Sequence, residues 1–297
     1  MHEERCPSAE DSTPPAQNYV PYEIIGELVT CLHIASLCSS STCGNAYLVW
    51  DDASRPVLVD CGISLKRLTA CLSSLGMQPC DLAGLFITHE HSDHIKSMCL
   101  RTPISQKFGI PVYASAGFWD WYEDHMACSC YLGRDLRRVM EPFETVRLPG
   151  GPCVTAFPKP HDAAEPFGFV VECGGERAGF AMDLGHVPDR IEGVLRGLTH
   201  LVFESNHDVQ MEKQSGRPYY LIRRVLGDLG HLSNDQAALS LSRLVTRDTR
   251  QVILAHLSLD CNTPELALAS VETALRSAGR MPALHAAPAG EMAVYGE

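Results

Sequence analysis

The segment THEHSDHI, residues 88–95, contains four potential metal ligands within a stretch of six residues. They are His89, His91, Asp93 and His94, and a short apolar stretch comes directly before them. Burying three imidazoles and a carboxylate together is costly unless another group compensates them. A divalent cation does so, because it accepts neutral imidazole nitrogens and carboxylate oxygens in one site. The spacing therefore predicts a metal site.

Three further candidate ligands occur later in the chain, each after a short and mostly apolar run. They are His161 in PHDA, Asp183 in MDLG and His256 in LAHLS. Ligands that follow buried strands meet at the same edge of a packed sheet. We therefore expect these residues to join the first cluster and to complete a site for two divalent metal ions.

The elements that must position these residues can be predicted from the pattern of apolar residues. Runs rich in β-branched and large side chains predict buried strands at 57–59, 85–87, 154–157, 179–182, 201–203 and 252–255. Helical spacing predicts helices over 64–76, 234–246 and 264–279, with Ser64 and Asn234 as N-caps and Gly76 and Gly279 after the helix ends. Strands that alternate with helices indicate the α/β class.

The composition indicates one large globular domain. Hydrophobic residues make up 45% and charged residues 20% of the 297 residues, which allows a sizeable core. Residues 1–20 are polar and lack the apolar core of a signal peptide, so we expect a disordered tail ahead of a domain over 21–297. No apolar run approaches the roughly 18–20 residues of a membrane-spanning helix. We expect a cytoplasmic protein that binds no membrane.

Charge and cysteine content exclude two other kinds of site. A net charge of −12 argues against a broad basic surface for nucleic acid, although it leaves room for a local basic groove. The 13 cysteines include no CxxC pair. In a reducing compartment they are expected to be reduced and mostly buried, so a structural zinc site built on thiolates is not expected.

The order of these ligands resembles that of the metallo-β-lactamase-fold hydrolases, over residues 22–297. Smaller motifs resemble the YycJ/WalJ-like branch, which is related to tRNase Z and the β-CASP nucleases. These motifs are SLCSSSTCGN (36–45), DCGIS (60–64), HDAAEPFGF (161–169), ESNHD (204–208), GHLSN (230–234) and LAHLS (254–258). The first departs from the form of the branch, with Ser41 and Thr42 in place of Gly-Ser. The resemblance implies an αββα sandwich, two mixed sheets with helices on the outer faces.

The resemblance also implies a role for each ligand. One ion would be held by His89, His91 and His161, and the other by Asp93, His94 and His256, with Asp183 bridging the two. A hydroxide between the ions would be the nucleophile, and Asp93 would also orient it. Mixed histidine and carboxylate ligands suit zinc, manganese or iron.

His231, in GHLSN, lies outside the seven ligands. The resemblance to tRNase Z-like enzymes implies that it serves phosphodiester cleavage with Glu204 as its supporting acid. A protonated imidazole can stabilise the charge of the transition state and protonate the leaving oxygen. The alternative is that His231 only begins a helix. Asn45 and His207 are candidate substrate-binding residues, and His207 could instead serve only to fix its loop.

The segment KQSGRPYYLIRR, residues 213–224, combines basic and aromatic residues with no acid among them. Such a mixture suits the backbone and the bases of a nucleic acid. Arg217, Arg223 and Arg224 are therefore candidate substrate contacts, and the alternative is that they form a solvated helix face.

These features predict a metal-dependent phosphodiester hydrolase, an exonuclease with DNA as partner, and the resemblance favours 5′-to-3′ digestion. The acidic net charge would also suit a phosphodiesterase for small cyclic or nucleotide substrates. A thioester or lactone hydrolase of the glyoxalase II kind would use the same seven ligands but does not require His231 with Glu204. A non-enzymatic interaction protein is disfavoured, because every expected ligand position is filled. The oligomeric state stays open.

Overall fold

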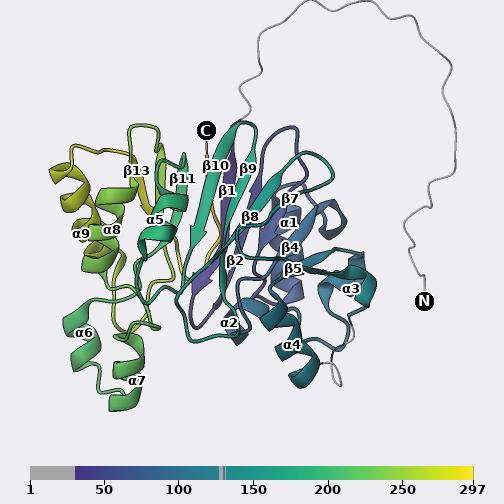
Figure 1. Cartoon of the computed structure of the whole chain (residues 1–297), viewed down its shortest axis with the longest axis horizontal. Coiled ribbons are helices and arrows are strands. Elements are labelled where there is room, and N and C mark those ends of the chain that lie inside the picture. Colours follow the sequence, from purple (N-terminus) through teal and green to yellow (C-terminus); the bar gives the residue numbers. More distant parts are fainter. Residues whose placement is uncertain (1–30, 127–129, 131, 297) are drawn as a thin grey trace, which may run out of the picture.

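Two seven-stranded sheets face each other in the structure, a computed structural model that describes residues 31–126, 130 and 132–296 (Figure 1). The predicted tail, residues 1–20, lies outside the described residues. In spatial order the first sheet comprises β14 (Ala293–Tyr295), β1 (His33–Ser40), β2 (Gly44–Trp50), β3 (Val57–Val59), β4 (Gly84–Phe86), β5 (Val112–Ala114) and β6 (Arg137–Val139). The second comprises β13 (Ala283–Ala286), β12 (Gln251–Ala255), β11 (His200–Glu204), β10 (Glu176–Ala181), β9 (Phe167–Cys173), β8 (Cys153–Pro158) and β7 (Thr145–Arg147).

Helices cover the outer face of each sheet (Figure 1). The first sheet is covered by α1 (Leu65–Ser74), α3 (Ile104–Phe108) and α4 (Ala116–His125). The second is covered by α5 (Asp189–Leu195), α8 (Asn234–Leu244) and α9 (Pro264–Ser277). Two 3₁₀ turns, η1 (Pro79–Asp81) and η2 (Arg134–Leu136), lie in the connections. The predicted αββα layering is confirmed.

Both sheets are mixed, and their parallel strands run to one edge of the sandwich. Strands β3 to β6 are parallel neighbours in the first sheet, as are β10 to β13 in the second, and the other pairs are antiparallel. Three short helices lie at this edge: α2 (Ser92–Ile95), α6 (Val209–Gln214) and α7 (Tyr219–Val225) (Figure 1).

The central strands have continuous apolar sequences because their alternate side chains face two apolar surroundings, the core between the sheets and the outer helices. In β12, Ile253 and Ala255 face the core between the sheets, while Val252 and Leu254 pack against the outer helices. A strand buried on both faces cannot place polar residues on alternate positions. Polar side chains are therefore found mainly at the ends of such strands and in the residues that follow them, where the candidate ligands lie.

The predicted helices form, with small differences at their ends. Ser64 caps α1 as expected, its side chain accepting from the Arg67 amide. The predicted cap Asn234 is wrong, because Ser233 caps α8 by accepting from the Gln236 amide. The Asn234 side chain instead bonds to Ser205 and Asn262. No helix within the described residues has the length and apolarity needed to cross a bilayer.

Gly62 brings the end of the first sheet against α2, the short helix that carries Asp93 and His94. Its amide donates to the Asn45 carbonyl (2.8 Å), and the neighbouring Cys61 amide donates to the His94 carbonyl (2.8 Å). A Cβ atom on Gly62 would lie 1.5 Å from the Asp93 carbonyl oxygen. Only glycine allows this approach of two backbones.

We expect Gly62→Ala to destabilise the protein by about 3 kcal/mol or more, because the Asp93 carbonyl must move and two backbone hydrogen bonds go with it. The matched control is Gly193→Ala in α5, where an added Cβ meets nothing within 4 Å. That change should stabilise by about 0.5–1 kcal/mol through helix propensity. Urea unfolding of both variants measures the contrast, and equal stabilities for the two would contradict this account of Gly62.

Candidate metal centre

The predicted ligands converge from both sheets on one edge of the sandwich. His89 and the loop leading into α2 follow β4, and Asp183 and His256 follow β10 and β12. His161 follows β8, which runs in the same direction as β10 because both are antiparallel to β9. The carboxyl ends of strands that run in the same direction meet at one edge of a sheet. The loops that carry the candidate ligands in the two sheets therefore lie side by side.

His89, His91 and His161 form one group of potential ligand atoms that all lie within 4.8 Å of one another. The His91 Nδ1 atom is 3.0 Å from His89 Nε2 and 3.3 Å from His161 Nε2. The family resemblance implied this trio, and the structure brings its three imidazoles close together.

Asp93, His94 and His256 form a second group within 4.8 Å. The Asp93 Oδ2 atom lies 3.5 Å from His94 Nε2 and 3.4 Å from His256 Nε2. Asp183 lies between the two groups, since its carboxylate is 3.1 Å from His94 Nε2 and 3.4 Å from His256 Nδ1, and it also falls within 4.8 Å of His89.

Residues behind these groups hold the imidazole rings in place. The buried Asp60 carboxylate is 2.7 Å from His94 Nδ1 and accepts from the Thr88 amide and hydroxyl. The Thr88 hydroxyl is 2.8 Å from His89 Nδ1. Fixing the outer ring nitrogen sets the tautomer that leaves the inner nitrogen available to a metal. The sequence placed Asp60 at a strand end but did not assign it to the site.

Glu204 is fully buried and its carboxylate accepts four hydrogen bonds. Oε1 is 2.8 Å from His231 Nδ1 and 3.0 Å from His256 Nδ1, and Oε2 accepts from the Leu184 and Leu232 amides. Burial alone would raise the pKa of this carboxyl, but the His231 imidazole and the hydrogen bonds from His231 and His256 hold it at about 2. Glu204 therefore orients His256 as well as His231, which extends the role predicted from the sequence.

His231 combines a fixed ring with access to solvent. Its Nδ1 is held by Glu204 and lies 3.6 Å from Asp183 Oδ1. Its side chain is 12% exposed, whereas Glu204 and His256 are inaccessible. The alternative that His231 only begins a helix does not account for these contacts, because α8 begins at Asn234 with Ser233 as its cap.

Burial favours the neutral form of the three imidazoles of the first group. Burial lowers the pKa of His91, lowers that of His89 well below its usual value, and lowers that of His161 to about 3. Only the neutral imidazole offers a lone pair to a metal. This half of the site therefore presents metal-binding nitrogens without the need to displace protons.

The second group favours positive charge. Burial would lower the pKa of His94 and His256, but the carboxylates around them, Asp183 foremost, raise that of His94 well above its usual value and that of His256 to about 10. Burial would raise the pKa of Asp183, yet His256, His94 and Lys159 hold it well below its usual value. The carboxylates that stabilise the protonated forms of His94 and His256 would stabilise a metal cation in the same place.

These observations fit a divalent metal. Among the described residues, the buried Asp183 Oδ2 forms no well-directed hydrogen bond, although His94 Nε2 lies 3.1 Å and Lys159 Nζ 3.8 Å away. A buried carboxylate oxygen is costly unless well-directed donors or cations compensate its charge, and a divalent cation can do so here. Its surroundings are imidazole nitrogens and a second carboxylate, a donor set that suits zinc, manganese and iron alike.

Lys159 belongs to the site but was missed in the sequence. Its buried ammonium donates to the Met182 carbonyl (2.7 Å) and lies 3.8 Å from Asp183 Oδ2. No motif marks it, because its position two residues before His161 becomes informative only when β8 and β10 lie at the same edge. The lysine compensates part of the negative charge of Asp183.

Three residues of the site adopt a backbone conformation that is unusual for side chains other than glycine. Asp60, Asp183 and His256 have φ angles of 57°, 56° and 57°, and each lies one or two residues after the end of its strand. The left-handed region is unfavourable for residues with a Cβ atom, and such residues concentrate at functional sites. The turn after each strand aims the side chain across the sandwich edge.

Four of the residues predicted to contact substrate either bond to other residues of the chain or are buried away from solvent. The Asn45 side chain is buried and donates to Asp93 Oδ2 (3.1 Å), so it positions a candidate ligand. His207 is 1% exposed, and in this structure its ring lies out of reach of a substrate. Arg217 pairs with Glu212 and Asp260, and Arg224 forms a two-pronged ion pair with Asp162. These pairs account for two of the three arginines predicted to contact substrate.

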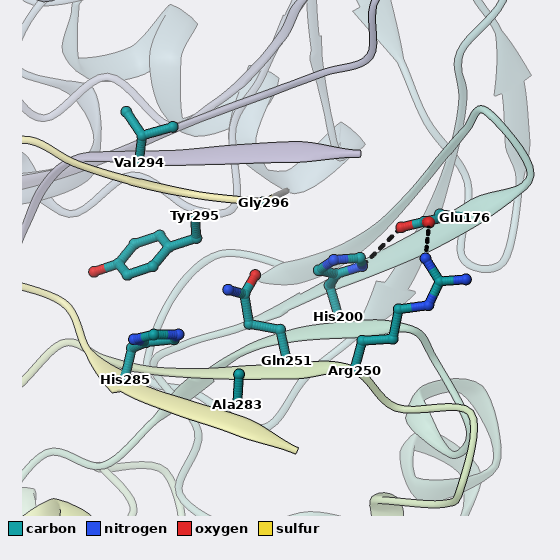
Figure 2. A pocket seen from close by; sticks show the side chains of 9 residues that line it. All are labelled: Glu176, His200, Arg250, Gln251, Ala283, His285, Val294, Tyr295 and Gly296. Carbon is teal, nitrogen blue, oxygen red and sulfur yellow. Dashed lines mark hydrogen bonds and ion pairs between the residues drawn. The ribbon is translucent and has the colours of Figure 1, made fainter. Parts of the chain in front are cut away.

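A cavity of about 530 Å³ lies at the opposite edge of the sandwich (Figure 2). Its lining includes Glu176, His200 and Gln251, the first residues of β10, β11 and β12, whereas the candidate ligands follow the other ends of these strands. Glu176 pairs there with His200 and Arg250. This cavity shares no residue with the histidine clusters, so its size does not make it the reactive site.

Comparisons with known proteins agree with this geometry. A family model described as the beta-lactamase superfamily domain matches residues 55–257. The chain is 37% identical to Exodeoxyribonuclease YycJ of Bacillus anthracis, over 84% of this chain and 90% of that protein. It is 32% identical to Exodeoxyribonuclease WalJ of Streptococcus pneumoniae, over 78% of this chain and 84% of that protein.

Solved structures show the same fold at low sequence identity. The metallo-beta-lactamase fold protein YhfI from Bacillus subtilis superposes with a TM-score of 0.66 at 14% identity, covering 90% of this chain and all of that one. Zn²⁺-bound PqqB from Methylobacterium extorquens superposes with a TM-score of 0.63 at 16% identity, covering 88% and 99% of the two chains. These likenesses confirm the predicted sandwich.

The contact of Lys159 with Asp183 predicts a larger loss of stability in the metal-free than in the metal-loaded protein when the lysine is removed. We expect Lys159→Met to destabilise the metal-free protein by about 1–3 kcal/mol, since Asp183 loses a buried cation. The loaded protein should lose less, because bound cations repel the lysine. The rise in Tm on metal addition should therefore be larger in the variant than in the parent. Lys66→Met, at an exposed position of α1, is the control, and an unchanged rise for Lys159→Met would show that the lysine does not sense the metal.

Proposed function

Because this chain belongs to the beta-lactamase superfamily and has its metal-dependent hydrolase fold, we propose that it hydrolyses phosphodiester bonds of DNA as an exonuclease, with 5′-to-3′ digestion. The resemblance predicted from the motifs is confirmed by the relatives named above. Their names support DNA as the substrate. The observation in this chain that supports phosphoryl rather than acyl chemistry is the Glu204–His231 pair beside the two ligand groups.

The ligand geometry supports a binuclear centre. In this proposal His89, His91 and His161 would hold one ion, Asp93, His94 and His256 would hold the other, and Asp183 would serve both groups. Divalent ions in such a site supply Lewis acidity and activate water at neutral pH. Zinc or manganese fits this donor set, and iron is also compatible with it.

The chain's own residues provide orientation and proton transfer. The Asp93 side chain is 20% exposed, and its Oδ2 is held by Asn45 and lies near His256 Nε2. It is placed to accept a hydrogen bond from the attacking water and so to set the direction of attack. On the other side, His231 donates from Nδ1 to Glu204, which leaves Nε2 for the substrate.

His231 then acts on the phosphoryl group as donor and general acid. From Nε2 it donates a hydrogen bond to a phosphoryl oxygen, whose charge rises in the transition state, and gives its proton to the leaving oxygen. Glu204 accepts from Nδ1 throughout, so the ring does not turn as the proton leaves.

The first test concerns metal content. We expect close to two divalent ions per chain by elemental analysis of the purified protein. Asp183→Ala should lose both in large part, because its carboxylate reaches both ligand groups. Asp52→Ala, at an exposed position, should retain the parental content. One ion in the parent, or parental content in Asp183→Ala, would exclude the binuclear arrangement.

The second test concerns His231. His231→Ala should keep its metal and its fold while turnover on DNA falls by about 10²–10⁴-fold, the range for a positioned acid–base group. His125→Ala, at an exposed position at the end of α4, is the matched control. Near-parental turnover in metal-replete His231→Ala would remove the proposed role.

The Glu204→Gln variant extends this test. Because Glu204 also holds His256, it should lose part of its metal as well as part of its turnover. At matched metal occupancy, the losses from His231→Ala and Glu204→Gln should be less than additive, since the two residues act as one unit.

A substrate panel separates the alternatives. It comprises single- and double-stranded DNA with defined 5′ ends, RNA, bis(p-nitrophenyl) phosphate, a cyclic nucleotide and a glutathione thioester. Hydrolysis of the thioester alone would assign the protein to acyl chemistry. Hydrolysis of small phosphodiesters without DNA would assign it to the small-molecule phosphodiesterases.

A further inference from the structure

The helix α7 presents an unusual surface beside the metal centre. Tyr219 and Tyr220, in its first turn, are 75% and 74% exposed, the highest values among the large hydrophobic side chains that the structure describes. Together with α6, this helix extends beyond the edge of the sandwich at which the candidate ligands converge (Figure 1). Single exposed apolar residues are ordinary, but two adjacent exposed rings form a surface of their own.

The basic residues around these tyrosines differ in their availability. Arg217 and Arg224 are engaged in ion pairs with carboxylates of the chain. Arg223 is exposed, and its guanidinium lies 6.0 Å from the centroid of the Tyr219 ring. We refer to Tyr219, Tyr220 and Arg223 as the α7 platform. It combines two flat rings with one available cation.

Contacts at the other end of α7 fix the platform relative to the metal centre. The Arg224 guanidinium donates two hydrogen bonds to the carboxylate of Asp162, the residue that follows the candidate ligand His161. The His231 amide donates to the Val225 carbonyl (3.0 Å). A Cβ on Gly230 would lie 2.2 Å from the Arg224 carbonyl oxygen, so the backbones of α7 and the His231 loop touch.

Helical spacing places the tyrosines in line with these contacts. Residues four apart share a helix face, and a turn rises by about 5–6 Å. Tyr220 therefore lies one turn from Arg224, on the face that reaches Asp162, and Tyr219 lies one turn from Arg223. A polymer that leaves the metal centre along α7 meets a ring within one helical turn.

We propose that the α7 platform stacks against the bases of single-stranded DNA and guides one end of the strand to the metal centre. This inference rests on the proposed function. Every base has a flat face that an aromatic ring can stack on, and this gives grip without sequence preference. Bases offer these faces only when they are unpaired, so the platform contacts the DNA where it is single-stranded.

The negative net charge of the chain favours binding through base stacking over binding through contacts with the DNA phosphates. The chain carries a net charge of −12, and two arginines of the basic segment are already neutralised. Duplex binding that depends on many phosphate contacts needs a positive surface and falls steeply with salt. A platform of two rings and one arginine predicts binding with a shallow salt dependence.

The test compares Tyr219→Leu/Tyr220→Leu with Tyr219→Phe/Tyr220→Phe in the metal-loaded enzyme. The substrates are 5′-phosphorylated oligo(dT) and an oligonucleotide of equal length with abasic residues behind the first nucleotides. We expect the leucine variant to raise KM for oligo(dT) by about tenfold to a hundredfold, as stacking losses do, with kcat nearly unchanged. The phenylalanine variant should retain the parental KM, because it keeps the rings.

Two controls separate stacking from general damage. The leucine variant and the parent should hydrolyse the abasic strand with the same KM, since that strand offers no bases to stack. Hydrolysis of bis(p-nitrophenyl) phosphate should also be unchanged. Met281→Ala, at an exposed position at the opposite edge of the sandwich, should leave KM for oligo(dT) at the parental value.

The outcomes distinguish this inference from the proposed function. The platform is overturned, and the proposed function survives, if the parent hydrolyses DNA but the leucine variant keeps the parental KM for oligo(dT). The same holds if the leucine change raises KM equally for oligo(dT) and for the abasic strand. If oligo(U) is hydrolysed at a lower KM than oligo(dT) and the leucine change affects only oligo(U), the ligand is RNA and the assignment to DNA is overturned. If the parent hydrolyses no DNA, the proposed function fails and this inference fails with it.

Discussion

A single buried carboxylate, that of Glu204, determines how the reactive edge of this protein is assembled. It accepts hydrogen bonds from two imidazoles and two backbone amides, which belong to the ends of β10 and β12 and to the loop before α8. A carboxylate without solvent is stable only when its acceptor positions are filled. Because four donors from three segments meet on one residue, each segment fixes the position of the others.

The same principle is repeated on the other sheet by Asp60. It accepts from Thr88 and lies against His94, so a strand end of the first sheet orients one imidazole as Glu204 orients another. Asp60 and the candidate ligands Asp183 and His256 also occupy strained left-handed backbone conformations. Strain of this kind persists only where surrounding contacts overdetermine it. The buried hydrogen bonds therefore supply the rigidity that a metal centre requires.

Much of the site could be predicted from sequence, for a reason that the strands make clear. A central strand such as β12 is apolar from Val252 to Ala255, so the first polar residue after this run, His256, marks the end of the strand. Predicting Asp183 followed the same logic, and the family resemblance added His231 and Glu204. The pairing of Arg217 with Asp260 and of Arg224 with Asp162 could not be predicted, because each joins residues more than 40 positions apart. Lys159 was missed for a similar reason, since its partner lies on another strand.

The pairing of β14 with β1 has a consequence for how the chain matures during synthesis. Ile34 is matched with Tyr295, so the first sheet gains its edge strand only when the last part of the described chain has been made. His256 also emerges late, long after His89 and its neighbours. Such distant pairings slow folding, and partly folded chains expose apolar surface. A nascent chain on the ribosome would thus carry His89, His91 and His161 without His256 for much of translation, so the two ligand groups are completed at different times.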